Sequence, residues 1–188
     1  SWTVEGEARK NLTQNNSADG IIAMITGMGS LSYGELAGER MKLGLMLNDP
    51  EEEHDCFSDN THNSHYYDAM SIQNVYLGEY QRIDGSLVEG TSLSSLVAQV
   101  SPQLDARMKG SLEFTMKQMQ VMVERAHTTE SYDQMIASGN KVGNQVIQNI
   151  VDSLTAQTSV IEELDTALLL GDLAFEGSDS LDNPTTIQ

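Results

Sequence analysis

The chain has 188 residues, enough for one sizeable domain with its own hydrophobic core. It carries 28 aspartates and glutamates against 10 lysines and arginines, which gives a formal net charge of −18 at pH 7. A surface this acidic repels nucleic-acid phosphates and anionic lipid headgroups, which excludes general electrostatic binding to either, so we expect no nucleic-acid partner. The same charge favours cations as ligands.

The single cysteine, Cys56, permits no internal disulfide, which fits the cytosol and equally a periplasmic protein with a large core. We expect Cys56 to be a small buried apolar residue rather than a reactive thiol. The longest mainly apolar stretch, Ile21–Leu31, is interrupted by glycines and polar residues and is shorter than the roughly 20 residues that span a bilayer. We therefore expect no transmembrane segment.

The start of the chain reads Ser-Trp-Thr-Val, without an initiator methionine, a basic region or an apolar leader. We expect it to come from inside a longer precursor. Residues 1–16 are rich in Asn and Gln and are expected to form an irregular initial segment.

A first long helix is predicted after Ser17 or Asp19, either of which can cap it. It ends at Asn48-Asp49-Pro50, because the residue before a proline avoids the α region. Glycines inside this helix cost about 1 kcal/mol each relative to alanine. Either the helix is broken near Gly29–Ser30, or the glycines permit the close approach of another segment. The glycines concerned are Gly27, Gly29, Gly34, Gly38 and Gly44.

A second helix is predicted to begin near Ser58 or Asn60 and to end at Asp84-Gly85, followed by a polar loop to Thr91. Its apolar face is formed, at spacings of three and four, by Ala69, Ile72, Tyr76, Tyr80 and Ile83. The apolar spacing over residues 93–100 then predicts a short helix.

A third long helix is predicted to begin at Ser101-Pro102, where a capping serine precedes a proline at the first helical position, and to reach about Ala126. The periodicity weakens over residues 127–139. Gly139-Asn140 then precedes a last long helix that continues to Leu168.

Four long amphipathic helices joined by short loops predict an all-α fold, an up-and-down four-helix bundle. The helical bundle domain is assigned to residues 17–173, and residues 174–188 are expected to form a flexible acidic tail. Ten methionines at helical spacing are expected to fill the core rather than to bind a soft metal.

The stretch from Glu51 to His65 holds three of the four histidines and the only cysteine, among five carboxylates. Oxygen and imidazole groups together suit a hard or borderline cation. The candidate ligands are Glu53, His54, Asp55, Asp59 and His62. The alternative is structural, in which Ser58, Asp59, Asn60 and Thr61 cap the second helix and the glutamates form a solvated loop. The pattern alone leaves both interpretations open.

Other catalytic arrangements are weaker. His127 and Glu130 form an H-x-x-E pair that would share a helix face, but such a pair is common by chance. Neither G-x-S-x-G nor H-E-x-x-H occurs, and no glycine-rich phosphate loop is present. Ser58 or Cys56 next to His54 lacks an evident oxyanion hole, so no hydrolytic triad is predicted.

The segment "GERMKLGLMLNDPEEEHDCFSDNTH", followed by "IQNVYLGEY", resembles the C-terminal half of the imelysin family. Further along, "SYDQMI" and "LTAQT…LDTALLLGD" also resemble its later helices, so the match extends from about Ile21 to Leu173. The resemblance implies two helical-bundle domains with a functional site between them, of which this chain is one. It also implies export to the bacterial periplasm or outer membrane, with a possible lipid anchor through the missing N-terminus.

The resemblance also implies site residues. Glu53 and His54 are the implied metal ligands, for iron, zinc or calcium. The other implied binding residues are Glu39, Arg40, Ser58, Asp59, Asn60, Thr61 and His62, with Arg40 orienting a carboxylate or another anionic group. His65 lies outside the matching motif and is not counted as a ligand.

The hallmark G-x-H-x-x-E of the family belongs to its N-terminal half. Here the H-x-x-E of His127 and Glu130 has Arg125 in place of the glycine, so this chain holds at most half of a catalytic site. We therefore expect a binding protein of bacterial iron acquisition. The alternatives are a metallopeptidase that holds its metal jointly with the other half, and a structural or interaction domain. The implied partners are the N-terminal imelysin half and an outer-membrane or periplasmic iron-uptake protein.

Overall fold

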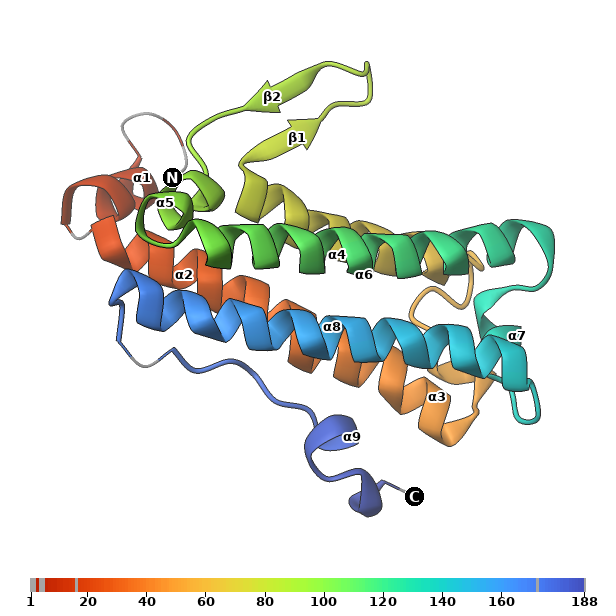
Figure 1. The fold of residues 1–188 in the computed structure, drawn as a ribbon. Helices are drawn as coiled ribbons and strands as arrows, with labels where there is room; N and C mark the ends of the chain where they lie inside the picture. Colours follow the sequence, from red (N-terminus) through yellow and green to blue (C-terminus); the bar gives the residue numbers. More distant parts are fainter. Residues whose placement is uncertain (1–2, 4–5, 16, 172, 188) are drawn as a thin grey trace.

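The computed structural model describes residues 3, 6–15, 17–171 and 173–187. Four long helical segments form an up-and-down bundle, as predicted (Figure 1). The first segment is continuous and consists of α2 (Ser17–Ser30), the π-helix η2 (Leu31–Lys42) and α3 (Leu43–Leu47). The other three are α4 (Thr61–Leu77), α6 (Pro102–Thr128) and α8 (Lys141–Leu168).

Short elements connect and flank these segments. Residues 7–15, expected to be irregular, form helical turns instead. The short elements are α1 (Glu7–Lys10), η1 (Asn11–Asn15), η3 (Pro50–Glu52), β1 (Glu79–Gln81), β2 (Leu87–Glu89), α5 (Leu93–Val100), α7 (Tyr132–Ile136), α9 (Asp179–Asp182) and η4 (Pro184–Thr186).

Helix starts follow the sequence signals closely. The Ser101 hydroxyl accepts the backbone N–H of Leu104 at the start of α6, with Pro102 in the first turn. The Asn140 side chain accepts the N–H of Gly143 at the start of α8. Each cap satisfies a backbone N–H donor that the helix itself leaves unpaired. The residue types at these positions therefore predict the helix starts from the sequence.

The second helix is shorter than predicted. α4 ends at Leu77 because Gly78 takes a left-handed backbone (φ 67°), and a Cβ at Gly78 would come within 2.9 Å of the Ser92 side chain. The chain then turns into the β1–β2 hairpin, where Tyr80 pairs with Val88. Tyr80 and Ile83, predicted to lie on the apolar face of the helix, are exposed. The predicted end at Asp84-Gly85 was therefore wrong.

The interior is filled along the whole bundle by two clusters of buried apolar side chains, one toward α5 and one toward α7. Methionines contribute to both, as expected. The buried ones are Met28, Met41, Met108, Met119, Met122 and Met135. Within the described ranges, no helix combines the length and the apolar character that crossing a membrane would require.

The topology decides where the loops meet. In an up-and-down bundle the connection from helix one to helix two lies at the same end as the connection from helix three to helix four. Residues 48–60 and residues 129–140 are these two connections, and they lie together at one end (Figure 1). There α7 packs directly against η3.

Three glycines of the first segment, Gly29, Gly34 and Gly38, pack closely against the C-terminal tail. The first segment does not break at Gly29–Ser30. A Cβ on Gly34 would lie 2.5 Å from the carbonyl oxygen of Glu176, and one on Gly38 would lie 2.2 Å from the Cβ of Ser178. The close-approach alternative is therefore the correct one, and the approaching segment is the tail (Figure 1).

The tail is also held by hydrogen bonds. The Ser178 hydroxyl donates to Glu39 Oε1 at 2.6 Å, and the Ser180 hydroxyl donates to the carbonyl oxygen of Gly38 at 2.9 Å. The Tyr33 hydroxyl donates to Asp182 at 2.7 Å. Ser178 and Ser180 are buried by this contact, so residues 175–182 pack against the bundle in the segment for which a flexible tail was expected. The flexibility itself stays a prediction.

This packing predicts opposite effects for two glycines of the same helical segment. Gly38→Ala should destabilise the protein by about 1–3 kcal/mol, because the added methyl overlaps Ser178. Gly27→Ala, where a Cβ would meet nothing within 4 Å, should be neutral or stabilise by up to about 1 kcal/mol. Urea unfolding of both variants gives the comparison, and equal effects would contradict this account of the tail.

Candidate functional site

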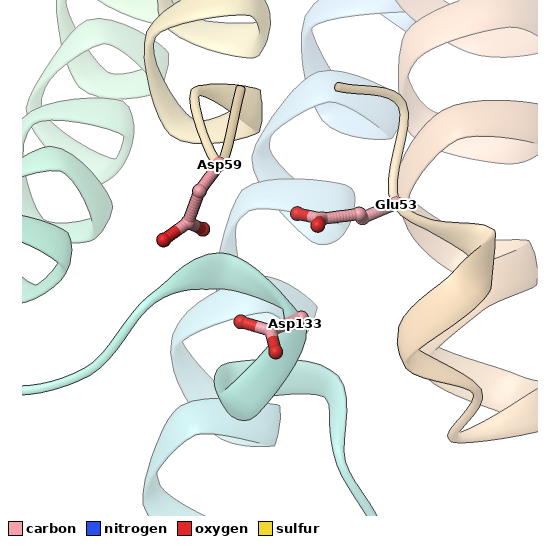
Figure 2. Close-up of side chains that lie close together, drawn as sticks. All are labelled: Glu53, Asp59 and Asp133. Atoms are coloured by element: carbon pink, nitrogen blue, oxygen red, sulfur yellow. The ribbon is translucent and has the colours of Figure 1, made fainter. Parts of the chain in front are cut away.

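The candidate site lies at the bundle end where the two connections meet. Figure 2 shows three carboxylates there that point toward one another: Glu53 after η3, Asp59 just before α4, and Asp133 on α7. One oxygen from each lies within 4.8 Å of the others. The carboxylates come from both connections, so no single stretch of sequence contains the group.

Thr61 fixes the loop that carries two of these carboxylates. Its buried hydroxyl donates to Glu53 Oε2 at 3.0 Å and accepts the backbone N–H of Asp55 at 3.0 Å. Asp59 takes a left-handed backbone (φ 50°), which aspartate tolerates better than most side chains. The loop is thus held onto the first turn of α4, with Glu53 turned inward and Asp59 in a tight reversal.

The three carboxylates border an open hollow of about 430 Å³. Its lining residues are Pro50, Glu51, Glu53, Cys56, Asp59, Ser131, Asp133 and Gln134. Ser131 donates a hydrogen bond to Asp133 and helps to orient it. Among the residues that the structure describes, neither Glu53, Asp59 nor Asp133 has a Lys or Arg ion-pair partner.

Glu53 is the buried member of the group, with 8% of its surface exposed. Burial raises the pKa of its carboxyl above the usual value, the hydrogen bond from Thr61 opposes that shift, and the negative charges of Asp133, Asp59 and Asp55 add to it. The site therefore concentrates negative charge around a partly desolvated carboxylate, and a cation placed among the three would relieve both effects.

Arg40 lies beside the site, but its guanidinium is already paired with other side chains of the protein. Its Nε donates to Glu35 at 2.8 Å and its Nη1 donates to Asp68 at 2.9 Å. The same Nη1 lies 3.1 Å from Nε2 of His54, which acts as the acceptor because a guanidinium can only donate. His54 therefore points to Arg40 and is not a member of the carboxylate group that contains Glu53.

His65 is fully buried beneath this network. Its ring packs edge-on against Tyr132 at 5.1 Å between centroids and lies 6.3 Å from the His54 ring. Within the described part of the chain, neither ring nitrogen has a hydrogen-bond partner at normal bonding geometry, and a weaker interaction with the Arg40 backbone only partly opposes the effect of burial. Burial, and next the charge of Arg40, lower the pKa of His65 to about 3, so the ring is neutral at physiological pH.

His62 and His127 meet on the other side of the loop. Their ring centroids are 5.1 Å apart and the ring planes are nearly perpendicular. Burial lowers the pKa of His62, and His127 lowers it further. Glu130 turns away to Arg125, with 2.7 Å between Arg125 Nε and Glu130 Oε1, so the H-x-x-E pair is separated by its own ion pair.

The remaining candidates have local roles. Glu39 faces the tail and accepts from Ser178, away from the carboxylate group. Asn60 is the N-cap residue of α4, as predicted, but its side chain bonds to Asn63 rather than to the helix backbone. The Ser58 hydroxyl donates to the carbonyl oxygen of Asp55. Cys56 is exposed at the hollow, so the prediction of a buried cysteine was wrong.

Sequence reasoning missed Asp133, because the weak periodicity of residues 127–139 hides the short helix α7. A signal was present, since "SYDQMI", which contains Asp133, is one of the segments that resemble the imelysin family. The partnership of His127 with His62 was missed as well.

The fold and the site together define a helical-bundle protein with an acidic, histidine-bordered site at one end. The family model described as imelysin matches residues 1–161, most of the chain. The chain therefore belongs to the imelysin family. A comparison with curated proteins gives no match.

Burial of His65 predicts a loss of stability in acid. Unfolding returns its pKa to about 6.5, so the unfolded state binds the proton first and stability falls as pH drops from about 6.5 toward 3. Relative to His65→Gln, the wild type should lose up to about 1.4 kcal/mol per pH unit in this window. Urea unfolding from pH 7 to pH 4.5 measures the slope, with exposed His54→Gln as the control. Parallel curves for wild type and His65→Gln would contradict this account.

Proposed function

We propose that this protein binds a divalent cation through Glu53, Asp59 and Asp133. The observation that carries the proposal is the convergence of three carboxylates from two connections, one of them buried, without a Lys or Arg partner among the described residues. Structural carboxylates at a helix end normally find a cation or water, because an unpaired buried charge is expensive. Here Thr61 donates to Glu53 and Ser131 donates to Asp133, but the nearest charged groups are the other two carboxylates, which supports a cation as the missing counter-charge.

The ligand atoms indicate the class of cation. Three carboxylate oxygens suit a hard ion such as calcium or manganese, or iron(II) at the border of that class. Zinc would be expected to recruit nitrogen or sulfur instead. Open space in the hollow leaves room for water or for a ligand group to complete the coordination.

We further propose that this site serves iron acquisition in an exported, periplasmic or outer-membrane protein. Membership of the imelysin family supports this proposal, and the family suggests a second helical domain. The two connections that line the hollow lie at one end of the bundle (Figure 1), and in our proposal the second domain covers the hollow there. In that arrangement Glu53, Asp59 and Asp133 form one wall of an interdomain site.

Removal of single carboxylates tests the site. Asp133→Asn and Asp59→Asn should each weaken binding of calcium, manganese or anaerobic iron(II) by about tenfold or more, because affinity for such ions follows the number of charged ligands. Isothermal titration calorimetry of each ion gives the affinities. Asp152→Asn on α8 is the matched control, since it removes the same charge from an exposed position.

The result that would overturn the proposal is equal affinity in Asp133→Asn, Asp59→Asn and Asp152→Asn, or no binding of any of the three ions by the wild type. A chelator-sensitive cleavage of a peptide substrate, lost in Asp133→Asn, would favour the metallopeptidase alternative instead of pure binding.

Glu53→Gln separates a binding role from a structural one. Without metal at pH 7.5 this variant should melt above the wild type, because it removes a buried charge that the neighbouring carboxylates oppose while its amide oxygen can still accept from Thr61. With calcium at 100 times the dissociation constant, the wild type should gain about 2.7 kcal/mol and the variant much less. Thermal melts with and without metal measure both effects. A variant that melts lower in both conditions would indicate that Glu53 serves only to hold the loop.

A further inference from the structure

His62 and His127 form a second arrangement that the carboxylate site does not use. His62 lies in the first turn of α4 and His127 lies in the last turn of α6, so the bundle brings together two imidazoles that are far apart in the sequence. Their ring centroids are 5.1 Å apart with planes at 87°. His62 is buried, with 7% of its surface exposed, whereas His127 is exposed to solvent.

The buried imidazole has an unused nitrogen. Nε2 of His62 lies 3.2 Å from the side-chain amide of Asn63, but Nδ1 has no hydrogen-bond partner among the residues that the structure describes. A buried polar nitrogen without a partner costs about 1–3 kcal/mol, so its retention points to a ligand. A metal ion is a natural partner for a neutral imidazole nitrogen.

The spacing of the rings fits a shared metal. A zinc–nitrogen bond is about 2.0–2.1 Å long. The ring centroid lies about 1.1 Å beyond the bound nitrogen, so two imidazoles on one tetrahedral ion have centroids about 5.2 Å apart. The observed 5.1 Å agrees with this spacing.

We infer that His62 and His127 bind a borderline divalent transition metal, of the zinc, copper(II) or nickel class, at the end of α6. Imidazole prefers these ions over calcium or magnesium, so this site differs in ligand chemistry from the three carboxylates. The exposed side of His127 leaves the remaining coordination positions to water or to a ligand from another molecule. The nearby carboxylate of Asp59 adds a negative charge that favours a cation.

The competing explanation is a packing contact alone. Two rings packed edge to face contribute about 0.5–1.5 kcal/mol to stability without any metal. That explanation predicts a small change in melting temperature for His127→Ala and no change in metal affinity. The two explanations therefore differ in a binding measurement, whatever happens to stability.

The experiment is a zinc titration against a competing indicator, in untagged protein with Cys56→Ser so that the exposed thiol does not bind the metal. His127→Ala and His127→Asn should weaken zinc binding by about 10- to 100-fold, because each leaves one imidazole. His54→Ala, which removes another exposed histidine from the same end of the bundle, is the matched control and should leave the affinity within twofold. Unchanged affinity in both His127 variants would overturn the inference.

A second readout uses copper(II) at one equivalent in the same Cys56→Ser protein. Its electron paramagnetic resonance spectrum should show coupling to two imidazole nitrogens, reduced to one in His127→Ala. Asp133→Asn should leave zinc and copper binding within twofold, so failure of the carboxylate site and failure of this site are separate outcomes. Coupling to nitrogen that persists unchanged in His127→Ala would also overturn the inference.

Discussion

The hydroxyl of Thr61 is the point on which the site end of the bundle depends. It is the first residue of α4, and it donates to Glu53 while accepting from the backbone of Asp55. Two bonds from one buried group thus tie Glu53 and Asp55 of the loop to the first turn of α4. Because the loop is fixed, Glu53 is held inward and Asp59 is held in its left-handed reversal, so both carboxylates face Asp133 on α7 (Figure 2).

The charges at this end are divided between two neighbouring groups. Arg40 forms ion pairs with Glu35 and Asp68 and donates to His54. Among the described residues, Glu53, Asp59 and Asp133 have no Lys or Arg partner. A protein selected only for stability would be expected to replace a buried, like-charged carboxylate, since uncharged side chains of similar shape pack there without the desolvation penalty. The cation that we propose would supply the counter-charge that the described side chains do not.

Local signals in the sequence were enough for most of the fold. Ser101-Pro102 and Asn140 predicted the starts of α6 and α8, because a cap depends on residues within one turn. The hairpin after Gly78 was not predictable in the same way, since Tyr80 and Ile83 continue the helical spacing and only the contact of Gly78 with Ser92 ends α4. Periodicity records which positions are apolar, and it cannot register a close approach by a distant residue.

The site was predictable only in part, for a related reason. Glu53, Asp59 and His62 lie in one unusual stretch and were recognised there, whereas Asp133 and His127 join them through the bundle topology. Cys56, which was expected in the core, is exposed. The hydrogen bond between Thr61 and Glu53 holds its loop to the bundle, so burial of Cys56 is not needed to hold the loop in place.

Neighbouring residues in one turn of η2 contact different segments of the structure. Adjacent positions on a helix point roughly 80–100° apart, so positions 38, 39 and 40 of η2 cannot all face one surface. Gly38 and Glu39 face the tail, where the carbonyl oxygen of Gly38 accepts from Ser180 and Glu39 accepts from Ser178, while Arg40 faces the loop and holds His54. Glu39 and Arg40 of the family-like sequence Gly-Glu-Arg therefore point in different directions, and their role in binding stays a prediction. This one turn of η2 contacts both the C-terminal tail and the loop that carries the site. The packing of the tail and the position of that loop therefore depend on the same stretch of backbone.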